Sequence, residues 1–291
     1  MPISRTNKSP RLRAAVGGIV LSCASSASLG ATPFLVEDIN GGSQDSTPLE
    51  FVTIGGITFF SADDGITGRE LWKTDGTTAG TVLVKDILPG ISSSFPANLT
   101  DVDGTLFFSA DDGSTGFELW KSDGTPEGTL LVKDIRAGTA DAAPENLVNI
   151  GGTVFFSAND GAVGSELWKS DGSAAGTVLV KDIRPGSPSA SPESLTNVGG
   201  TLFFTARDDS SGNELWKSDG TSAGTVLVKD IRPGGASSLP ENLTDVDGTL
   251  FLSARGAATG DELWKSIVSC TAKQPMQLRP RPTTRWSDWL Q

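Results

Sequence analysis

Pairs of acidic residues beside glycine recur along this chain, and they are the first candidates for chemistry. Asp63-Asp64-Gly65 and Asp111-Asp112-Gly113 resemble half of a calcium-binding loop, since clustered carboxylates beside a glycine turn suit a hard cation. The loops lack the alternate-residue carboxylates and closing glutamate of a helix-loop-helix site, so hairpin-turn chemistry is the preferred interpretation and no cofactor is assigned. The calcium candidates are Asp63, Asp64, Asp111, Asp112, Asp160 and Asp208.

The tryptophans suggest a second chemistry, because exposed aromatic rings stack on sugar faces. Each indole, however, lies in the middle of a predicted strand beside an apolar leucine, which favours core packing. We expect the lysine that follows each tryptophan to be a solvated charge at the end of a strand. The residues expected to form the repeated core are Trp72, Trp120, Trp168, Trp216 and Trp264, and those expected to accept backbone N–H bonds within their own turns are Asp75, Asp123, Asp171 and Asp219.

The chain of 291 residues contains no histidine and no tyrosine. Histidine is the usual general base and the commonest metal ligand, so histidine triads, histidine-ligated zinc and histidine acid–base catalysis are excluded. An enzyme built from this sequence would have to use carboxylates, serine, threonine or lysine.

Charge is distributed unevenly along the chain. The net charge is −12, but residues 32–266 hold 34 acidic against 15 basic side chains, a net charge of −19 for that region. Such a surface repels nucleic-acid phosphates and anionic lipid, and it favours cations, basic partners or neutral ligands such as sugars. Solubility alone is the simpler explanation.

The two ends differ from the rest of the chain. Residues 1–31 place four basic side chains ahead of an apolar, small-residue run, which predicts an export signal and a secreted or cell-surface protein without a membrane span. Val20-Leu21-Ser22-Cys23 loosely resembles a bacterial lipobox, and the alternative is therefore a lipid anchor on Cys23. Residues 267–291 form a basic, non-repeat tail that we expect to be disordered. The second and last cysteine, Cys270, lies there, so no disulfide framework is expected.

One stretch recurs along the chain, and its tryptophan marks the register. The five tryptophans from Trp72 to Trp264 are spaced at 48 residues without insertion or deletion, which indicates one structural unit stacked repeatedly. Within the second unit, apolar runs predict four short strands. The Asp103-Gly104 pair between the first two predicts a type I′ hairpin turn, because both central positions of that turn need positive φ. The unit is therefore predicted to be a four-stranded antiparallel meander.

The predicted strands are apolar on both faces. Leu106-Phe107-Phe108 and Leu130-Leu131-Val132 are continuous apolar runs, and a four-stranded sheet covered on both faces by copies of itself is a propeller blade. Leu35–Ile39 matches a fourth strand alone, and no fourth strand follows Ser266. We therefore predict an all-β, five-bladed β-propeller over residues 32–266, closed by pairing of the N-terminal strand into the last blade. The alternative is a fragment of a longer array.

The repeated motif carries a resemblance to a known family. Glu-Leu-Trp-x-x-Asp-Gly-Thr-x-x-Gly-Thr stands at residues 70–81, 118–129 and 214–225, with Ser173 replacing threonine at 166–177, and it is truncated after Glu262. On these residues the chain resembles the bacterial ELWxxDGT repeat family over about residues 34–266. The resemblance implies a large secreted or surface repeat protein and no common activity. The strand order also resembles a WD-repeat blade, whose histidine is missing here.

The near-identity of the units argues against an enzyme, because a catalytic site needs unlike groups that converge at one point. We expect a monomeric, non-enzymatic scaffold or interaction module that binds an unidentified protein or glycan and no nucleic acid. The alternative is a multivalent, lectin-like carbohydrate binder with one weak site per blade. A carboxylate-dependent glycosidase is the third hypothesis.

Overall fold

The computed structural model describes residues 33–267, in which every regular element is a β-strand. Contacts divide the chain into two units, Met1–Leu35 and Val36–Gln291, and all the described strands belong to the second unit. The predicted export signal at 1–31, the alternative lipid anchor at Cys23 and all of the predicted tail after Ile267 lie outside the described residues. Between residues 33 and 267 no helix is long and apolar enough to cross a membrane.

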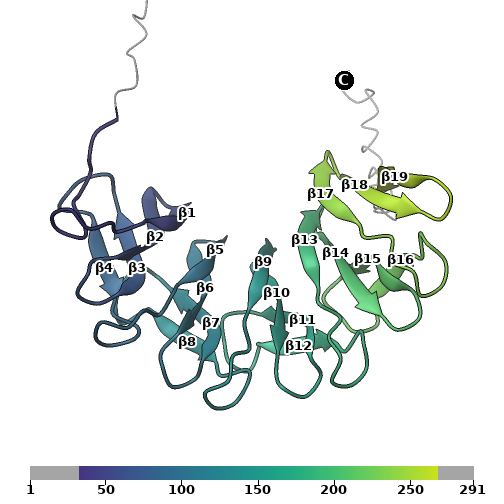
Figure 1. Ribbon diagram of the computed structural model, residues 1–291, viewed down its shortest axis with the longest axis horizontal. Coiled ribbons are helices and arrows are strands. Elements are labelled where there is room, and N and C mark those ends of the chain that lie inside the picture. The colour runs from purple at the N-terminus through teal and green to yellow at the C-terminus, as the bar shows by residue number, and fades with distance from the viewer. Residues whose placement is uncertain (1–32, 268–291) are drawn as a thin grey trace, which may run out of the picture. The chain divides into compact units, whose positions relative to one another are not determined.

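The strands form five antiparallel sheets that follow one another in chain order (Figure 1). The first sheet contains β1 (Leu49–Ile54), β2 (Ile57–Asp63), β3 (Arg69–Thr74) and β4 (Val82–Lys85). The second contains β5 (Ala97–Val102), β6 (Thr105–Asp111), β7 (Phe117–Ser122) and β8 (Leu130–Lys133). The third contains β9 (Glu145–Ile150), β10 (Thr153–Asn159), β11 (Ser165–Ser170) and β12 (Val178–Lys181). The fourth contains β13 (Glu193–Val198), β14 (Thr201–Asp208), β15 (Gly212–Ser218) and β16 (Val226–Lys229), and the fifth has only β17 (Glu241–Val246), β18 (Thr249–Gly256) and β19 (Gly260–Ile267).

The hairpin turns have the backbone conformation that their residues predict. Asp103 and Gly104 between β5 and β6 have φ of +50° and +91°, as a type I′ turn requires. The first two strands of each sheet also slip in register, as between Ala97 and Thr100 of β5. Asn98 lies within that slip at φ +58°, a left-handed conformation that asparagine tolerates better than most residues. The slip is a β-bulge that bends the first strand.

The hydrophobic core lies between consecutive sheets rather than within any one of them. Leu119 and Val132 of the second sheet pack in one cluster with Val154, Phe156 and Trp168 of the third, and the other junctions repeat this arrangement. Each interior sheet is therefore covered on both faces by its neighbours. Burying one indole contributes about 4–6 kcal/mol at most, from roughly 150–250 Å² at about 25 cal/mol/Å². Four tryptophans lie in these clusters with at most 8% exposure, namely Trp72, Trp120, Trp168 and Trp216, while Trp264 is partly buried.

The ring closure predicted from the strand count is not what the structure shows. The fifth sheet has three strands in the described residues, and Leu35–Ile39 forms no strand. Ile39 instead packs against Phe60 and Trp72 of the first sheet, and Thr78 Oγ1 donates a hydrogen bond to Val36 O at 2.7 Å. These contacts hold the Val36–Ile39 segment on the first sheet, and within the described residues no strand pairs with it. The all-β, propeller-like arrangement of the sheets is correct, and the closed ring is wrong.

Candidate functional site

In the second, third and fourth sheets, the turn between the third and fourth strands docks onto the preceding sheet. Lys73 Nζ of the first sheet donates a hydrogen bond to Gly124 O in the turn of the second, at 2.8 Å. The equivalent bonds from Lys121 to Gly172 O and from Lys169 to Gly220 O measure 2.8 and 2.9 Å. With a nearby phenylalanine, each lysine forms what we call a turn-docking site. The turn-docking sites are Phe59 with Lys73, Phe107 with Lys121, Phe155 with Lys169, and Phe203 with Lys217.

The docked position requires glycine for two reasons. Gly124 has φ of +87°, a left-handed conformation that other residues adopt only with strain. A Cβ atom on Gly124 would also lie 3.1 Å from Phe59 Cζ, which is tighter than ordinary van der Waals contact. Gly172 and Gly220 meet the same ring atom of their own docking sites at 3.1 and 3.0 Å. The phenylalanine ring therefore selects a turn whose backbone comes close to it.

The turn is held in shape by its own aspartate. Asp123 Oδ1 accepts hydrogen bonds from Thr125 Oγ1 at 2.7 Å and from Thr125 N at 2.8 Å. The bond from the Thr125 hydroxyl, followed by that from its backbone N–H, lowers the pKa of Asp123 and keeps the carboxylate ionised. Asp75, Asp171 and Asp219 make the same pair of bonds. The four aspartates thus accept hydrogen bonds within their own turns.

A second lysine strengthens each junction. Lys85 Nζ donates to Thr129 O of the next sheet at 2.7 Å and lies 6.0 Å from the centre of the Trp120 ring. Lys133 and Lys181 repeat both contacts with the sheets that follow them. Each complete junction therefore has two ammonium groups bound to carbonyl oxygens of the next turn, and charge-assisted bonds of this kind are the stronger ones.

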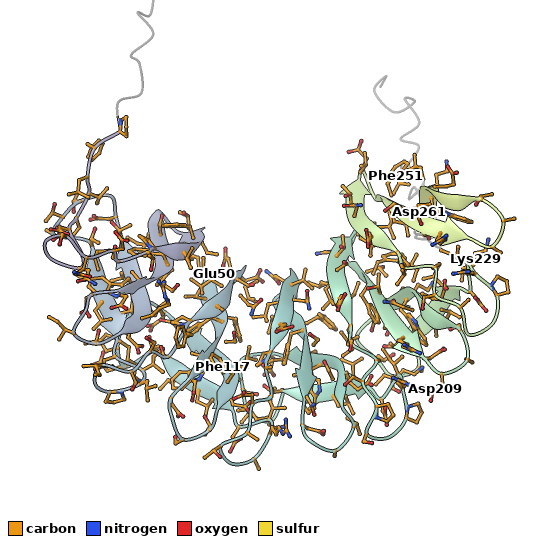
Figure 2. The ribbon with its side chains drawn as sticks, in the orientation of Figure 1. Glu50, Phe117, Asp209, Lys229, Phe251 and Asp261 are labelled. Carbon is orange, nitrogen blue, oxygen red and sulfur yellow. The ribbon has the colours of Figure 1, made fainter. Side chains whose placement is uncertain are left out.

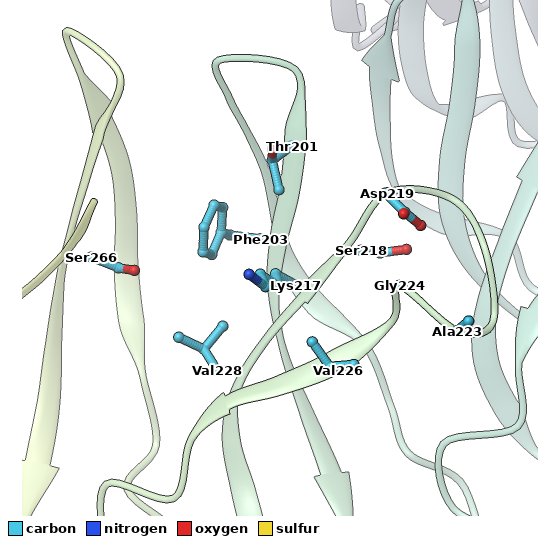
Figure 3. A pocket seen from close by; sticks show the side chains of 10 residues that line it. All are labelled: Thr201, Phe203, Lys217, Ser218, Asp219, Ala223, Gly224, Val226, Val228 and Ser266. Carbon is cyan, nitrogen blue, oxygen red and sulfur yellow. The ribbon is translucent and has the colours of Figure 1, made fainter. Parts of the chain in front are cut away.

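The fourth sheet has the same docking residues, Phe203 and Lys217. Among the described residues, however, no turn lies on them. The sequence of the fifth repeat ends its motif at Ser266 and has Val268 where the other repeats have the docked glycine. In the part of the chain that the structure describes, no carbonyl oxygen accepts a hydrogen bond from Lys217. A pocket of about 470 Å³ lies here, and Figure 3 shows Phe203, Lys217 and Val228 across it from Ser266 of β19.

A filled turn-docking site leaves much less space. The pocket around Phe155, Lys169 and Gly220, where the turn of the fourth sheet is docked, measures about 160 Å³. Lys217 is exposed, whereas its three counterparts at the filled sites are partly buried. Val228 is also less buried than Val180, its counterpart in the third sheet. Among the described residues no turn is docked in this pocket, and it is the candidate functional site.

Four glutamates that the sequence analysis did not single out are fully buried. Glu118 accepts hydrogen bonds from the backbone N–H groups of Ile135 and Arg136 at 2.8 and 3.1 Å, and so it holds the start of the chain segment that crosses to the next sheet. Burial raises the pKa of Glu118 to about 7. The residue before each Leu-Trp pair could have been identified from the sequence, because it is glutamate in every repeat. The set is Glu70, Glu118, Glu166 and Glu214, all with raised pKa values.

The calcium candidates use their carboxylates within their own loops. Asp112 Oδ1 accepts hydrogen bonds from Ser114 N and Thr115 N, both at 2.8 Å. Burial acts to raise the pKa of Asp112, but the hydrogen bonds together outweigh it, and the pKa is lowered. Asp63, Asp64, Asp111, Asp160 and Asp208 likewise accept bonds from backbone N–H groups two or three residues ahead. Among residues 33–267 no three carboxylate, cysteine or histidine side chains come together as metal ligands.

The expectations for the tryptophans and for the lysines that follow them have different outcomes. The interior tryptophans are buried between sheets, so their indole faces are not presented to solvent for sugar stacking. The lysines after them were expected to be solvated, and this is wrong for Lys73, Lys121 and Lys169. They bind carbonyl oxygens of the next sheet, because the neighbouring turn comes within reach of the end of the strand.

The chain is similar in part to several solved structures. No protein-family model matches the chain and no curated protein is similar to it, so the resemblance to the ELWxxDGT family stays a prediction. A puromycin hydrolase structure is 18% identical over 72% of this chain and 33% of its own, with a TM-score of 0.45. A puromycin-hydrolyzing peptidase of Mycobacterium tuberculosis is 11% identical over 77% and 36%, with a TM-score of 0.47, and BamB from Moraxella catarrhalis is 15% identical over 73% and 58%, with a TM-score of 0.35.

These comparisons correct the expected function. The expectation of a non-enzymatic scaffold, with a lectin-like binder as its alternative, rested on the near-identity of the units, because a catalytic site needs unlike groups that converge at one point. Several of the similar structures are peptidases, including prolyl endopeptidases and an acylaminoacyl peptidase, and the expectation is therefore withdrawn. The chain spans about a third of the length of these peptidases, so the likeness concerns the fold and assigns no reaction to this chain.

Proposed function

We propose that the protein binds polypeptide, and that the pocket of the fourth sheet receives a glycine-containing turn. The observation that carries this proposal is internal to the chain. Three turn-docking sites with the same phenylalanine and lysine hold such a turn, and the fourth presents the same two side chains around a pocket of about 470 Å³.

The groups around the pocket define what the ligand must offer. Lys217 supplies an ammonium donor for a backbone carbonyl, and the Phe203 ring supplies the surface that excludes a Cβ atom at the docked residue. Val226 and Val228 add apolar contact beside them. A short turn with one charge-assisted hydrogen bond and a small buried area binds weakly, with a dissociation constant on the order of 0.1–1 mM.

A peptide from the chain itself is the direct probe. We would add a capped peptide with the sequence of residues 122–129, Ser-Asp-Gly-Thr-Pro-Glu-Gly-Thr, to the full ¹⁵N-labelled chain and follow the amide chemical shifts. Saturable shifts of amides around Phe203 and Lys217 are expected. A peptide with alanine in place of its first glycine should bind at least about tenfold more weakly, because the added Cβ meets the phenylalanine ring.

Matched lysine variants decide whether the pocket is the site. Lys217→Ala should weaken binding of the peptide about tenfold, since it removes the donor to the docked carbonyl. Lys121→Ala should leave binding unchanged, because its turn-docking site is already filled by Gly172. No binding to the parent chain, or equal loss in the two variants, would overturn the proposal.

A further inference from the structure

The outer face of the fifth sheet is built like an interior face but has no sheet on it. Leu71, Leu119, Leu167 and Leu215 are at most 3% exposed, because each packs against the sheet that follows. Leu263 of β19 has the same place in the fifth sheet and is 77% exposed. Within residues 33–267 nothing covers this side chain.

Two further residues show that the whole face is open. Val246 is 49% exposed, whereas Val102 and Val198 at the same position are buried. Phe251, labelled in Figure 2, is less buried than Phe203, its counterpart in the fourth sheet. We call Val246, Phe251 and Leu263 the open face. Each of these side chains is of the type that a following sheet covers elsewhere in the chain.

The first sheet carries the matching half of a junction. The Val36–Ile39 segment has the repeat position of the chain from Val84 to Ile87, and it lies on the first sheet as that chain lies on the second. Phe51, at the position of the buried Leu99, is 63% exposed on the same sheet. The segment forms no strand in the described residues, whereas β4 is hydrogen-bonded to β3. The segment therefore lacks a partner strand of this kind among the described residues.

We propose that these two halves join between molecules, with the first sheet of a second copy of this chain packed on the open face. The Val36–Ile39 segment of that copy then adds a fourth strand to β19. The partner is a second copy because the chain already forms this junction four times between its own consecutive sheets, and because within the described residues nothing from the first sheet or from Val36–Ile39 pairs with β19. The two faces differ, so the contact is head-to-tail and extends beyond a dimer unless it closes.

The repeat predicts the register of this contact. Leu71, Leu119, Leu167 and Leu215 pair with Lys85, Lys133, Lys181 and Lys229 across the third and fourth strands. Glu37 lies 48 residues before Lys85, so it occupies the same repeat position and should pair with Leu263 of the other molecule. The proposal does not involve the pocket of the fourth sheet, and the two can fail separately.

Association is tested first by mass. Sedimentation velocity of the full chain over a concentration series should show species larger than the monomer, and Leu263→Asp should weaken association at least about tenfold, since a charge on the open face would be buried unpaired. Ile91→Asp is the matched control, because Ile91 is 86% exposed in the loop between β4 and β5 and belongs to neither half of the proposed contact. A chain that stays monomeric throughout, or equal effects of both variants, would overturn the proposal.

Crosslinking then tests the register and the partner. One chain carries Glu37→Cys and the other Leu263→Cys, both with Cys23→Ser and Cys270→Ser. A disulfide-linked dimer that forms only when the two chains are mixed is expected. In a chain with both new cysteines, a crosslink at monomer size that is independent of concentration would show closure within one molecule and would overturn the proposal, as would the absence of any crosslink.

Discussion

Leu215 of the fourth sheet and Leu263 of the fifth have the same place in the same motif, yet they are 3% and 77% exposed. Glu214 and Glu262 before them differ in the same way, one fully buried and the other exposed. The local sequence around both pairs is Glu-Leu-Trp-Lys-Ser. The difference is that another sheet follows Leu215 and none follows Leu263 among the described residues.

This comparison shows that an apolar side chain of one sheet is buried by the neighbouring sheet. A single sheet has two apolar faces and cannot cover either of them. Stability is therefore a sum of terms between neighbours, as in other repeat proteins, and an end sheet lacks one such term. The same side chain contributes to stability in an interior sheet and is available for binding in an end sheet.

The largest expected effect separates interior and end leucines. Leu167→Ala should lower the free energy of unfolding by about 2–5 kcal/mol, because it removes buried atoms and leaves a cavity between the third and fourth sheets. Leu263→Ala should change it by less than about 0.5 kcal/mol. Urea unfolding at a concentration where the chain is monomeric measures both. Equal losses would mean that the outer face of the fifth sheet is covered.

The interior sheets could be predicted from the sequence because three separate features of it indicate the same structure. Apolar runs of strand length, the Asp103-Gly104 turn and the constant spacing of the tryptophans all indicate the same four-stranded sheet, and the structure has it. The ends could not be predicted in this way. Leu35–Ile39 matches a fourth strand in sequence, but a strand also needs a partner edge, and among the described residues no strand pairs with this segment.

The candidate site was missed for a related reason. Lys73 and Lys217 lie in nearly identical segments, so no local pattern distinguishes the lysine that holds a turn from the one beside a pocket. The sequence does carry one signal, because Val268 stands where the other repeats have the docked glycine. That difference can be interpreted only once the docking of the other glycines is known. Glu118 was passed over because its role depends on the chain segment that it holds, seventeen residues further on.

A smaller effect concerns the buried glutamates and pH. The pKa of Glu118 is about 7 in the folded chain, above its ordinary value of 4.5. The folded state therefore holds this proton more tightly than the unfolded state does, and stability falls as the pH rises from about 4.5 to about 7 and stays at the lower level above it. Glu118→Gln cannot titrate, so it should remove part of that fall, and the rest comes from the raised pKa values of Glu70, Glu166 and Glu214.

The exposed counterpart provides the control for this pH experiment. Glu262→Gln should leave the pH dependence of unfolding unchanged, because Glu262 is exposed and holds no crossing segment among the described residues. Urea midpoints at a series of pH values would show the effect. A parent chain whose stability rises over this range would contradict the assignment of raised pKa values to the buried glutamates.

The smallest expected effect compares two lysines at turn-docking sites. Lys121→Met keeps the apolar stem but removes the ammonium that binds Gly172 O at 2.8 Å, and it should cost about 1 kcal/mol of unfolding free energy. Lys217→Met should cost less than about 0.5 kcal/mol, because no acceptor for Lys217 lies among the described residues. Both are measured by urea unfolding without added peptide. If Lys217→Met costs as much as Lys121→Met, then Lys217 already holds a carbonyl of its own chain, and the pocket of the fourth sheet is not a vacant turn-docking site.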